Sequence, residues 1–183
     1  MYTSLLRDAR FAHALFDMDE RIAAEARQRP CARCGGPLHR ADYRRKPRGA
    51  AWAEDPRHSV RQSLCCGRDG CRKRATPPSA RFLGRRVYWA VTVVLGAALQ
   101  HGLSARRVSR LSAELGVDRR TLSRWRQWWL QTYRRSEHFT RRRGELPATL
   151  DVATLPQSLL DAFTGDAPAR MTALLRWLSS APG

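Results

Sequence analysis

The chain has 183 residues and a formal net charge of +18, from 34 lysine and arginine side chains against 16 aspartate and glutamate side chains. Hydrophobic residues make up 43% of the sequence, which contains six tryptophans, and this excludes a fully disordered polypeptide. The apolar run from Val87 to Leu99 is shorter than the roughly 20 residues that a bilayer requires, so we expect no membrane association.

The positive charge is confined to the middle of the chain. Residues 1–30 are neutral and residues 144–183 carry two basic against four acidic side chains. In contrast, residues 31–76 carry twelve basic against four acidic side chains, and residues 77–143 carry fifteen against three. Such a surface releases counterions when it binds a polyanion, so the composition predicts a nucleic-acid partner.

Residues 1–30 predict an N-terminal helix, with Thr3 or Ser4 available as its cap and Pro30 beyond its end. The apolar residues that recur at helical intervals are Leu6, Ala9, Ala14, Phe16, Ile22 and Ala23. Two interpretations stay open. The helix packs on its own protein, or it offers a surface to a second copy, as in a homodimer, or to a partner.

The first ten residues include Arg7, Asp8 and Arg10, where a secretory signal would be apolar, and the cysteines number five. These features predict a reducing bacterial cytoplasm and, with the charge, association with the nucleoid. In a reducing compartment, closely spaced cysteine pairs indicate metal ligands rather than disulfides.

Residues 31–78 predict a zinc ribbon. The segment has few long apolar runs and many turn-forming residues, including those at 46–49, and it cannot bury enough apolar area to fold alone. The expected ligands of a structural Zn²⁺ are Cys31, Cys34, Cys66 and Cys71. Four thiolates close the coordination shell and leave no position for an activated water, so the metal is not expected to be catalytic.

The third ligand is the open point of this prediction. If a strand runs through Cys65 and Cys66, their side chains point to opposite faces, and only one can join Cys71. We favour Cys66, since its turn is tighter, and expect Cys65 to be a small buried residue. His39 and His58 are possible fourth ligands, but we expect both to be solvated.

Residues 79–135 predict a compact trihelical domain, with helices over Phe82 to Gln100, Ser104 to Leu115 and Arg119 to about Tyr133. The last two helices have the spacing of a helix-turn-helix, with Gly116 at the turn and Asp118 as a cap. The side chains expected to face inward are Val108, Leu111, Leu115, Leu122, Trp125 and Trp129.

The second helix of this pair is the expected DNA-reading element. Its outward residues near the N-terminal end, where a major groove would be entered, are Arg119, Arg120, Thr121, Ser123, Arg124 and Gln127. Phosphate contacts are expected from Arg106, Arg107, Arg110, Arg134 and Arg135. Trp128 is a candidate for stacking on a base or a partner.

The end of the chain changes character. Residues 136–150 predict a basic linker or a frayed helix end, and residues 151–183 predict short amphipathic helices. These helices are either a docking or oligomerisation element or a lid on the core of the chain. Both interpretations stay open.

The cysteine pairs followed by the helix-turn-helix pattern resemble the DNA-recognition region of insertion-sequence transposases and their small accessory proteins. The similarity covers residues 31–133, and the segment CCGRDGCRKRATPPSARFLGRRVY, residues 65–88, looks like small bacterial proteins carried on mobile elements. The resemblance implies recognition of element ends or of a promoter, with a transposase as a possible partner of the C-terminal helices. Such transposases add a catalytic domain with three metal-binding carboxylates, and only 40 residues follow the basic region here.

The expected fold is mostly α with a small β zinc ribbon, in which a trihelical helix-turn-helix domain is flanked by N- and C-terminal helices. The expected function is non-enzymatic, zinc-stabilised binding of duplex DNA, as a transposition accessory factor or a transcriptional regulator. The alternative is an RNA-binding or ribonucleoprotein assembly component. No phosphate-binding GxxxxGK loop is present, and the absence of asparagine excludes a His-Asn-His nuclease.

Overall fold

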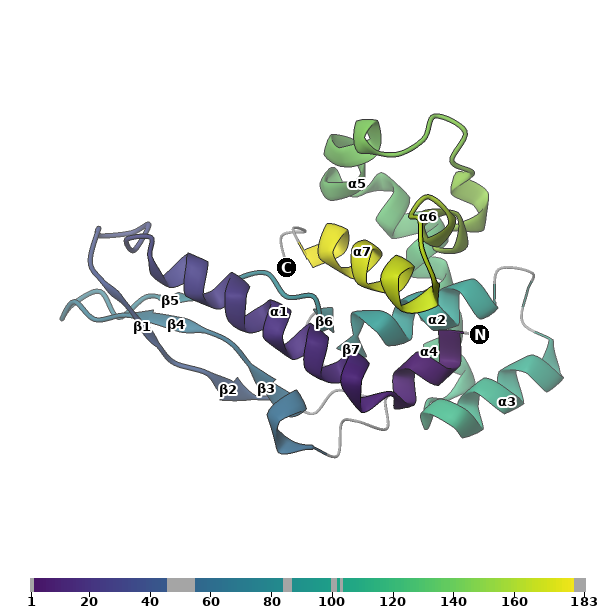
Figure 1. The fold of residues 1–183 in the computed structure, drawn as a ribbon, viewed down its shortest axis with the longest axis horizontal. Helices are drawn as coiled ribbons and strands as arrows, with labels where there is room; N and C mark the ends of the chain where they lie inside the picture. The colour runs from purple at the N-terminus through teal and green to yellow at the C-terminus, as the bar shows by residue number, and fades with distance from the viewer. Residues whose placement is uncertain (1, 46–54, 84–86, 100–101, 103, 180–183) are drawn as a thin grey trace.

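The structure is a computed structural model that describes residues 2–45, 55–83, 87–99, 102 and 104–179. The chain is mostly helical and carries small antiparallel sheets, which confirms the fold class expected from the sequence at this level. The strands between residues 38 and 75 lie at one end of the long axis of the molecule, and most of the helices gather at the other end (Figure 1). The turn residues expected at 46–49 and the helix end expected at Gln100 lie outside the described residues.

In the described part of the chain, seven short strands form three antiparallel sheets. The strands are β1 (Leu38–Arg40), β2 (Tyr43–Arg44), β3 (Val60–Arg61), β4 (Leu64–Cys66), β5 (Arg74–Ala75), β6 (Phe82–Leu83) and β7 (Val87–Tyr88). The largest sheet has the order β1-β4-β5, while β2 pairs with β3 and β6 pairs with β7. In the largest sheet, Leu38 lies opposite Cys66 and Leu64 lies opposite Ala75.

The helical part is built from longer α-helices joined by single turns. The α-helices are α1 (Ala9–Arg27), α2 (Trp89–Ala98), α3 (Ala105–Leu115), α4 (Arg119–Gln127), α5 (Glu137–Arg142), α6 (Gln157–Asp161) and α7 (Ala167–Ser179). The 3-10 turns are η1 (Tyr2–Arg7), η3 (Pro56–Ser59), η5 (Tyr133–Arg135), η6 (Arg143–Glu145) and η7 (Val152–Thr154). Between α4 and η5, the chain makes one π-helical turn, η4 (Trp128–Thr132).

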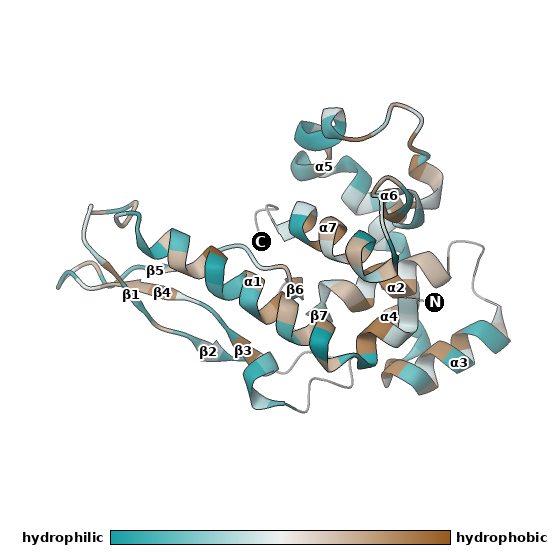
Figure 2. Ribbon diagram, viewed as in Figure 1, coloured by the Kyte–Doolittle hydropathy of each residue, from teal (hydrophilic) through white to brown (hydrophobic). Residues whose placement is uncertain are grey.

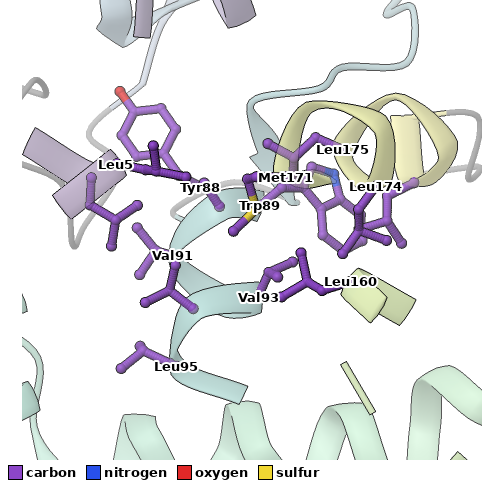
Figure 3. Packing of buried hydrophobic residues seen from close by; sticks show 14 of the residues in the cluster. Leu5, Tyr88, Trp89, Val91, Val93, Leu95, Leu160, Met171, Leu174 and Leu175 are labelled. Carbon is purple, nitrogen blue, oxygen red and sulfur yellow. The ribbon is translucent and has the colours of Figure 1, made fainter. Parts of the chain in front are cut away.

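Helix α2 lies at the centre of the core. Every residue from Trp89 to Gly96 is buried, as expected for a helix that is apolar on all sides. Figure 3 shows Leu5 of η1, Leu160 of α6 and Leu174 of α7 packed around it. No helix in the described part of the chain is both long enough and apolar enough to cross a bilayer.

The helix expected from Phe82 begins later, at Trp89. Phe82–Leu83 and Val87–Tyr88 instead form the β6–β7 hairpin. The Trp89 backbone N–H continues this pairing, because it donates to the Arg81 carbonyl at 2.8 Å. The aromatic and β-branched residues before Trp89 suit a strand as well as a helix, and the pairing across the hairpin decides between them.

Helix α1 begins at Asp8, whose carboxylate accepts from the Arg10 backbone N–H, so the cap expected at Thr3 or Ser4 is wrong. Its buried residues are Phe11, Ala12, Leu15, Met18 and Asp19. Ala9 and Ala14, expected on the apolar face, are exposed. The alternation of hydrophilic and hydrophobic residues along α1 in Figure 2 fits a helix that packs by one face on its own protein.

Residues 136–150 were expected to form a basic linker or a frayed helix end; in the structure α5 and η6 cover residues 137–145, and α5 buries His138 and Phe139. Ser136 caps α5 by accepting from the Phe139 backbone N–H. The apolar residues of the C-terminal helices are also buried in the main core, namely Leu159, Leu160, Met171, Leu174, Leu175, Trp177 and Leu178. Of the two interpretations of the tail, the structure therefore favours the one in which it covers the chain's own core.

A completely buried ion pair between Asp19 and Arg81 joins α1 to the segment before β6. The Asp19 carboxylate accepts from Arg81 Nε at 2.8 Å, and neither side chain is exposed. Asp19 also accepts from the Ser79 hydroxyl at 2.5 Å and from the Ala80 backbone N–H at 2.7 Å. Buried charges are tolerated when they are paired and hydrogen-bonded in this way.

The other side of the Arg81 guanidinium binds the strand region. Its terminal nitrogens donate to the carbonyls of His58 and Val60, at 3.1 and 2.8 Å, and to the Gln62 side chain at 2.7 Å. The Phe16 ring of α1 lies 4.9 Å from the guanidinium carbon. Arg81 thus connects α1, η3 and β3 to the helical core.

Removal of the Asp19 carboxylate is expected to cost about 3–5 kcal/mol of unfolding free energy, because Arg81 then stays buried without a counter-ion. Urea denaturation of Asp19→Ala, followed by tryptophan fluorescence, measures this loss. Asp17→Ala is the matched control, since Asp17 is exposed on the same helix and should change the stability by less than about 0.5 kcal/mol. Equal stability of the two variants would contradict the account.

Gly96 lets α2 approach its neighbours closely. A Cβ atom at this position would lie 2.6 Å from Pro156 Cδ and 2.7 Å from Trp129 Cδ1. Although alanine favours helices, Gly96→Ala is expected to lower the unfolding free energy by about 1–3 kcal/mol through overpacking. Thermal unfolding tests this, with Gly144→Ala as control, because no atom lies within 4 Å of a Cβ there. A Gly96→Ala protein as stable as wild type would contradict the packing.

Candidate functional site

Four cysteines meet at the strand end of the molecule. Cys31 and Cys34 lie on the turn that follows α1, Cys66 ends β4, and Cys71 lies on the turn between β4 and β5. Their sulfur atoms all lie within 4.8 Å of one another. The Cys34–Cys66 and Cys31–Cys71 sulfur distances are 3.4 and 3.9 Å, against about 3.8 Å for sulfurs at the corners of a tetrahedron around one Zn²⁺. The four residues can therefore hold one metal ion.

The two cysteine-bearing turns have the same backbone plan. In the first, the Gly35 N–H donates to the Cys31 carbonyl at 2.8 Å, and Gly35 has a φ of +69°. In the second, the Arg72 N–H donates to the Arg68 carbonyl at 3.3 Å, and Arg72 has a φ of +45°. The residue after the last cysteine of each pair thus has a left-handed backbone conformation. Glycine adopts this conformation freely, whereas arginine does not.

Apart from the sulfurs, this end of the molecule has little core. Its buried cluster consists of Cys31, Leu38, Leu64 and Cys66. A Cβ at Gly36 would lie 3.1 Å from the Cys66 sulfur and 3.4 Å from the Cys34 sulfur, so the backbone closes tightly over the thiols. Two buried leucines cannot fix a set of three-residue strands, whereas a bound ion can.

The thiols differ in their readiness to lose a proton. The backbone N–H groups of Arg33 and Cys34 lower the pKa of the Cys31 thiol to about 7. The backbone N–H of Arg68 lowers the pKa of Cys66, but burial and the three neighbouring thiols outweigh it and raise the pKa to about 12. The first thiolate therefore forms easily, and a cation is needed before all four are deprotonated.

Cys66, and not Cys65, belongs to this cluster, as the strand alternation predicts. The Cys65 sulfur lies 3.3 Å from the Arg72 carbonyl. Cys65 is partly exposed rather than buried, which corrects the expectation for it. His39 is exposed, as expected.

His58 was expected to be solvated but is 2% exposed. It lies in η3 against α1, where the ring centroids of His13 and His58 are 5.2 Å apart. Burial lowers the pKa of His58. His13, Asp55 and His58 form a second group of potential ligand atoms within 4.8 Å of one another, but Arg57 donates to both His13 and Asp55 and places a positive charge against them.

Many of the basic residues of the helical end lie on α3 and α4. These helices are joined by a turn in which Gly116 has a φ of +60°. Asp118 caps α4, because its carboxylate accepts from the Thr121 backbone N–H at 2.7 Å and from the Thr121 hydroxyl at 3.0 Å. Most of the residues expected to face inward are buried, namely Val108, Leu111, Leu115, Leu122 and Trp129, while Trp125 is partly buried against the core.

Most of the residues expected to contact DNA are accessible. The exposed ones are Arg106, Arg110, Arg119, Arg120, Arg124, Gln127, Arg134 and Arg135, and Arg107 and Ser123 are partly exposed. Thr121 is an exception at 4% exposure, since its hydroxyl serves the cap and accepts from Arg124 at 3.1 Å. Thr121 therefore positions α4 and Arg124 and is not an outward-facing residue.

Trp128 lies in an aromatic group at the π-helical turn. Its ring centroid is 4.9 Å from that of Trp129 and 5.1 Å from that of Tyr133. The extra residue of the π-turn lets Trp128, Trp129 and Tyr133 all face the body of the molecule. Trp128 also lines a cavity with Arg45 and Arg61. These residues are far apart along the chain, so local sequence patterns contain no signal for the cavity.

Comparison of the chain with protein-family models, with curated proteins and with solved structures returns no match.

Loss of one central sulfur is expected to abolish metal binding. Cys34→Ser should release the ion and lower the stability of the strand end, since three thiolates and a weak hydroxyl ligand cannot close the shell. Metal content after dialysis, measured by elemental analysis together with circular dichroism, tests this. Cys65→Ser is the matched control and should retain one metal ion per chain. An equal metal content in the two variants would contradict the assignment of the ligands.

Proposed function

We propose that this protein is a non-enzymatic DNA-binding protein in which one structural Zn²⁺ stabilises the strand end and the α3–α4 pair binds duplex DNA as a helix-turn-helix. The observation that carries the proposal is the exposed arginine face at the capped N-terminal end of α4. Arg119, Arg120 and Arg124 are accessible there, while the opposite face of the helix is buried through Leu122. A helix held in this way can enter a major groove without rearrangement.

The choice of Zn²⁺ follows from the donor set. Four sulfurs in a tetrahedral arrangement suit Zn²⁺ or an iron–sulfur centre. The sulfur separations of 3.4 and 3.9 Å match the edges of a tetrahedron around a single ion, which favours Zn²⁺. Because four cysteine thiolates would fill all coordination positions, the ion would stabilise the fold. We propose no catalytic role for these cysteines.

The preference for duplex DNA rests on the helix pair. Arginine can bind guanine through two hydrogen bonds, and the Arg124 guanidinium is oriented by its bond to Thr121. Arg106 and Arg110 on α3, with Arg134 and Arg135 beyond α4, extend the positive surface on both sides and suit phosphate contacts. Within this proposal, a transposition accessory role or transcriptional regulation would use the same surface, with a transposase or a second copy as possible protein partners.

The test begins with selection of a preferred site from a random duplex library. Fluorescence anisotropy over a salt series then compares that duplex with a structured RNA of equal charge. Arg124→Ala is expected to weaken binding of the selected site by roughly fivefold to 150-fold, the loss of one bidentate base contact. Arg21→Ala is the matched control, because it removes one exposed arginine from α1.

The control variant should bind the selected duplex with nearly wild-type affinity and the same sequence preference. Tighter binding of the RNA at matched salt would contradict the preference for DNA and favour the ribonucleoprotein alternative. Equal losses in Arg124→Ala and Arg21→Ala would mean that only bulk charge matters.

A further inference from the structure

A cavity of about 750 Å³ lies between the strands and the helical body. We call it the strand–helix cavity. Its lining includes Tyr43, Arg45, Arg61, Phe82, Trp128 and Tyr133. Its volume lies within the range of cavities that hold small organic ligands. The expected metal ligands and the residues expected to contact duplex DNA take no part in its lining.

One wall of the cavity is aromatic. The Trp128 and Tyr133 ring centroids are 5.1 Å apart at an interplanar angle of 37°, and Trp89 packs behind Trp128 at 5.8 Å. Phe82 supplies a further ring to the lining. The π-turn between α4 and η5 creates this wall, and π-turns of this kind are frequent at functional sites. Trp128 is partly exposed and can offer a π-face to a planar aromatic ligand, while Tyr133 is 2% exposed and packs against Trp128.

Two arginines also line the cavity. Arg61 is 8% exposed, and its terminal nitrogens donate to the carbonyls of Gln62 and Pro77. Arg45 donates to the Tyr43 hydroxyl at 2.6 Å, and its guanidinium carbon lies 4.4 Å from the centroid of that ring. Arg45 Nε is buried and has no hydrogen-bond partner among the described residues. A buried donor without an acceptor is unfavourable, so this nitrogen calls for an acceptor from a ligand.

The charges around the cavity favour an anion. Glu137 is the one carboxylate in its described lining, and it is paired with Arg141 at 2.6 Å. The two arginines therefore leave an excess of positive charge. Guanidinium groups bind phosphate oxygens with charge-assisted hydrogen bonds, while the aromatic wall accepts a flat ring.

We propose that the strand–helix cavity binds one unpaired nucleotide, with its base against Trp128 and its phosphate at Arg45 and Arg61. A nucleotide is the ligand that joins a flat heteroaromatic ring to an anion of this kind. In its DNA context the inference rests on the proposed function, because Trp128 and Tyr133 continue the helix whose N-terminal end carries the DNA-binding arginines. The cavity would then take a base that leaves the stack at the edge of the bound duplex.

The test uses 2-aminopurine deoxyribonucleoside 5′-monophosphate as the probe, with the corresponding nucleoside and inorganic phosphate as comparisons. Quenching of the probe by stacking reports binding to the aromatic wall. We expect saturable binding of the nucleotide and about tenfold weaker binding of the nucleoside, which lacks the charged acceptor. Phosphate should compete only weakly, because it makes no contact with the rings.

Two variants locate the site. Arg45→Ala should remove the preference for nucleotide over nucleoside, whereas Arg44→Ala, its exposed neighbour on β2 outside the lining, should keep it. Leu83→Trp, on the cavity wall, should block both probes by filling space. Circular dichroism and thermal unfolding of each variant establish that it folds, and a variant that does not fold is replaced by Arg45→Gln or Leu83→Phe.

Absence of saturable probe binding at millimolar concentration would overturn the inference, as would equal effects of Arg44→Ala and Arg45→Ala. Binding of the selected duplex is measured in parallel. If wild type binds the duplex but not the nucleotide, only this inference fails. If it binds the nucleotide but no duplex, the proposed function fails and the cavity remains a nucleotide site.

Discussion

The convergence of four cysteine sulfurs fixes the end of the molecule that has almost no core of its own. The strands there are two or three residues long, and among the described residues the buried cluster beside them holds two leucines besides the cysteines. A closed-shell ion would replace a hydrophobic core by four metal–sulfur bonds and would balance the charge of the thiolates. The same ion would fix both turns at once, because each turn contributes two sulfurs.

Helix α1 connects the strand end to the helical body. At its C-terminal end Ala26 packs on the cysteine cluster, and in its middle Glu20 binds Arg40 of β1 through two hydrogen bonds of 2.8 and 2.9 Å. One residue earlier, Asp19 holds Arg81 and through it the strand β3 and the hairpin before α2. Figure 1 shows α1 running along the strands toward the helical end. The cysteine turns are therefore connected through α1 and Arg81 to the hairpin before α2.

Short-range patterns in the sequence were enough to predict the features that depend on neighbouring residues. The cysteine spacing identified the four sulfurs that meet, and Gly116 and Asp118 placed the turn and the cap of α4 correctly. Features that depend on residues far apart were missed. Asp19 and Arg81 are separated by 61 residues, and nothing near either of them in the sequence indicates that they form a buried ion pair. His58 is buried where η3 packs against α1. The polar composition of residues 136–150 suggested a linker, yet His138 and Phe139 pack inward once α7 is in place.

X-ray absorption spectroscopy at the zinc edge of the purified protein tests the central claim most directly. The account predicts one zinc per chain with four sulfur neighbours at about 2.3 Å and no nitrogen or oxygen in the first shell. A first shell that contains nitrogen or oxygen, or a fully folded protein with oxidised cysteines and no bound metal, would contradict it.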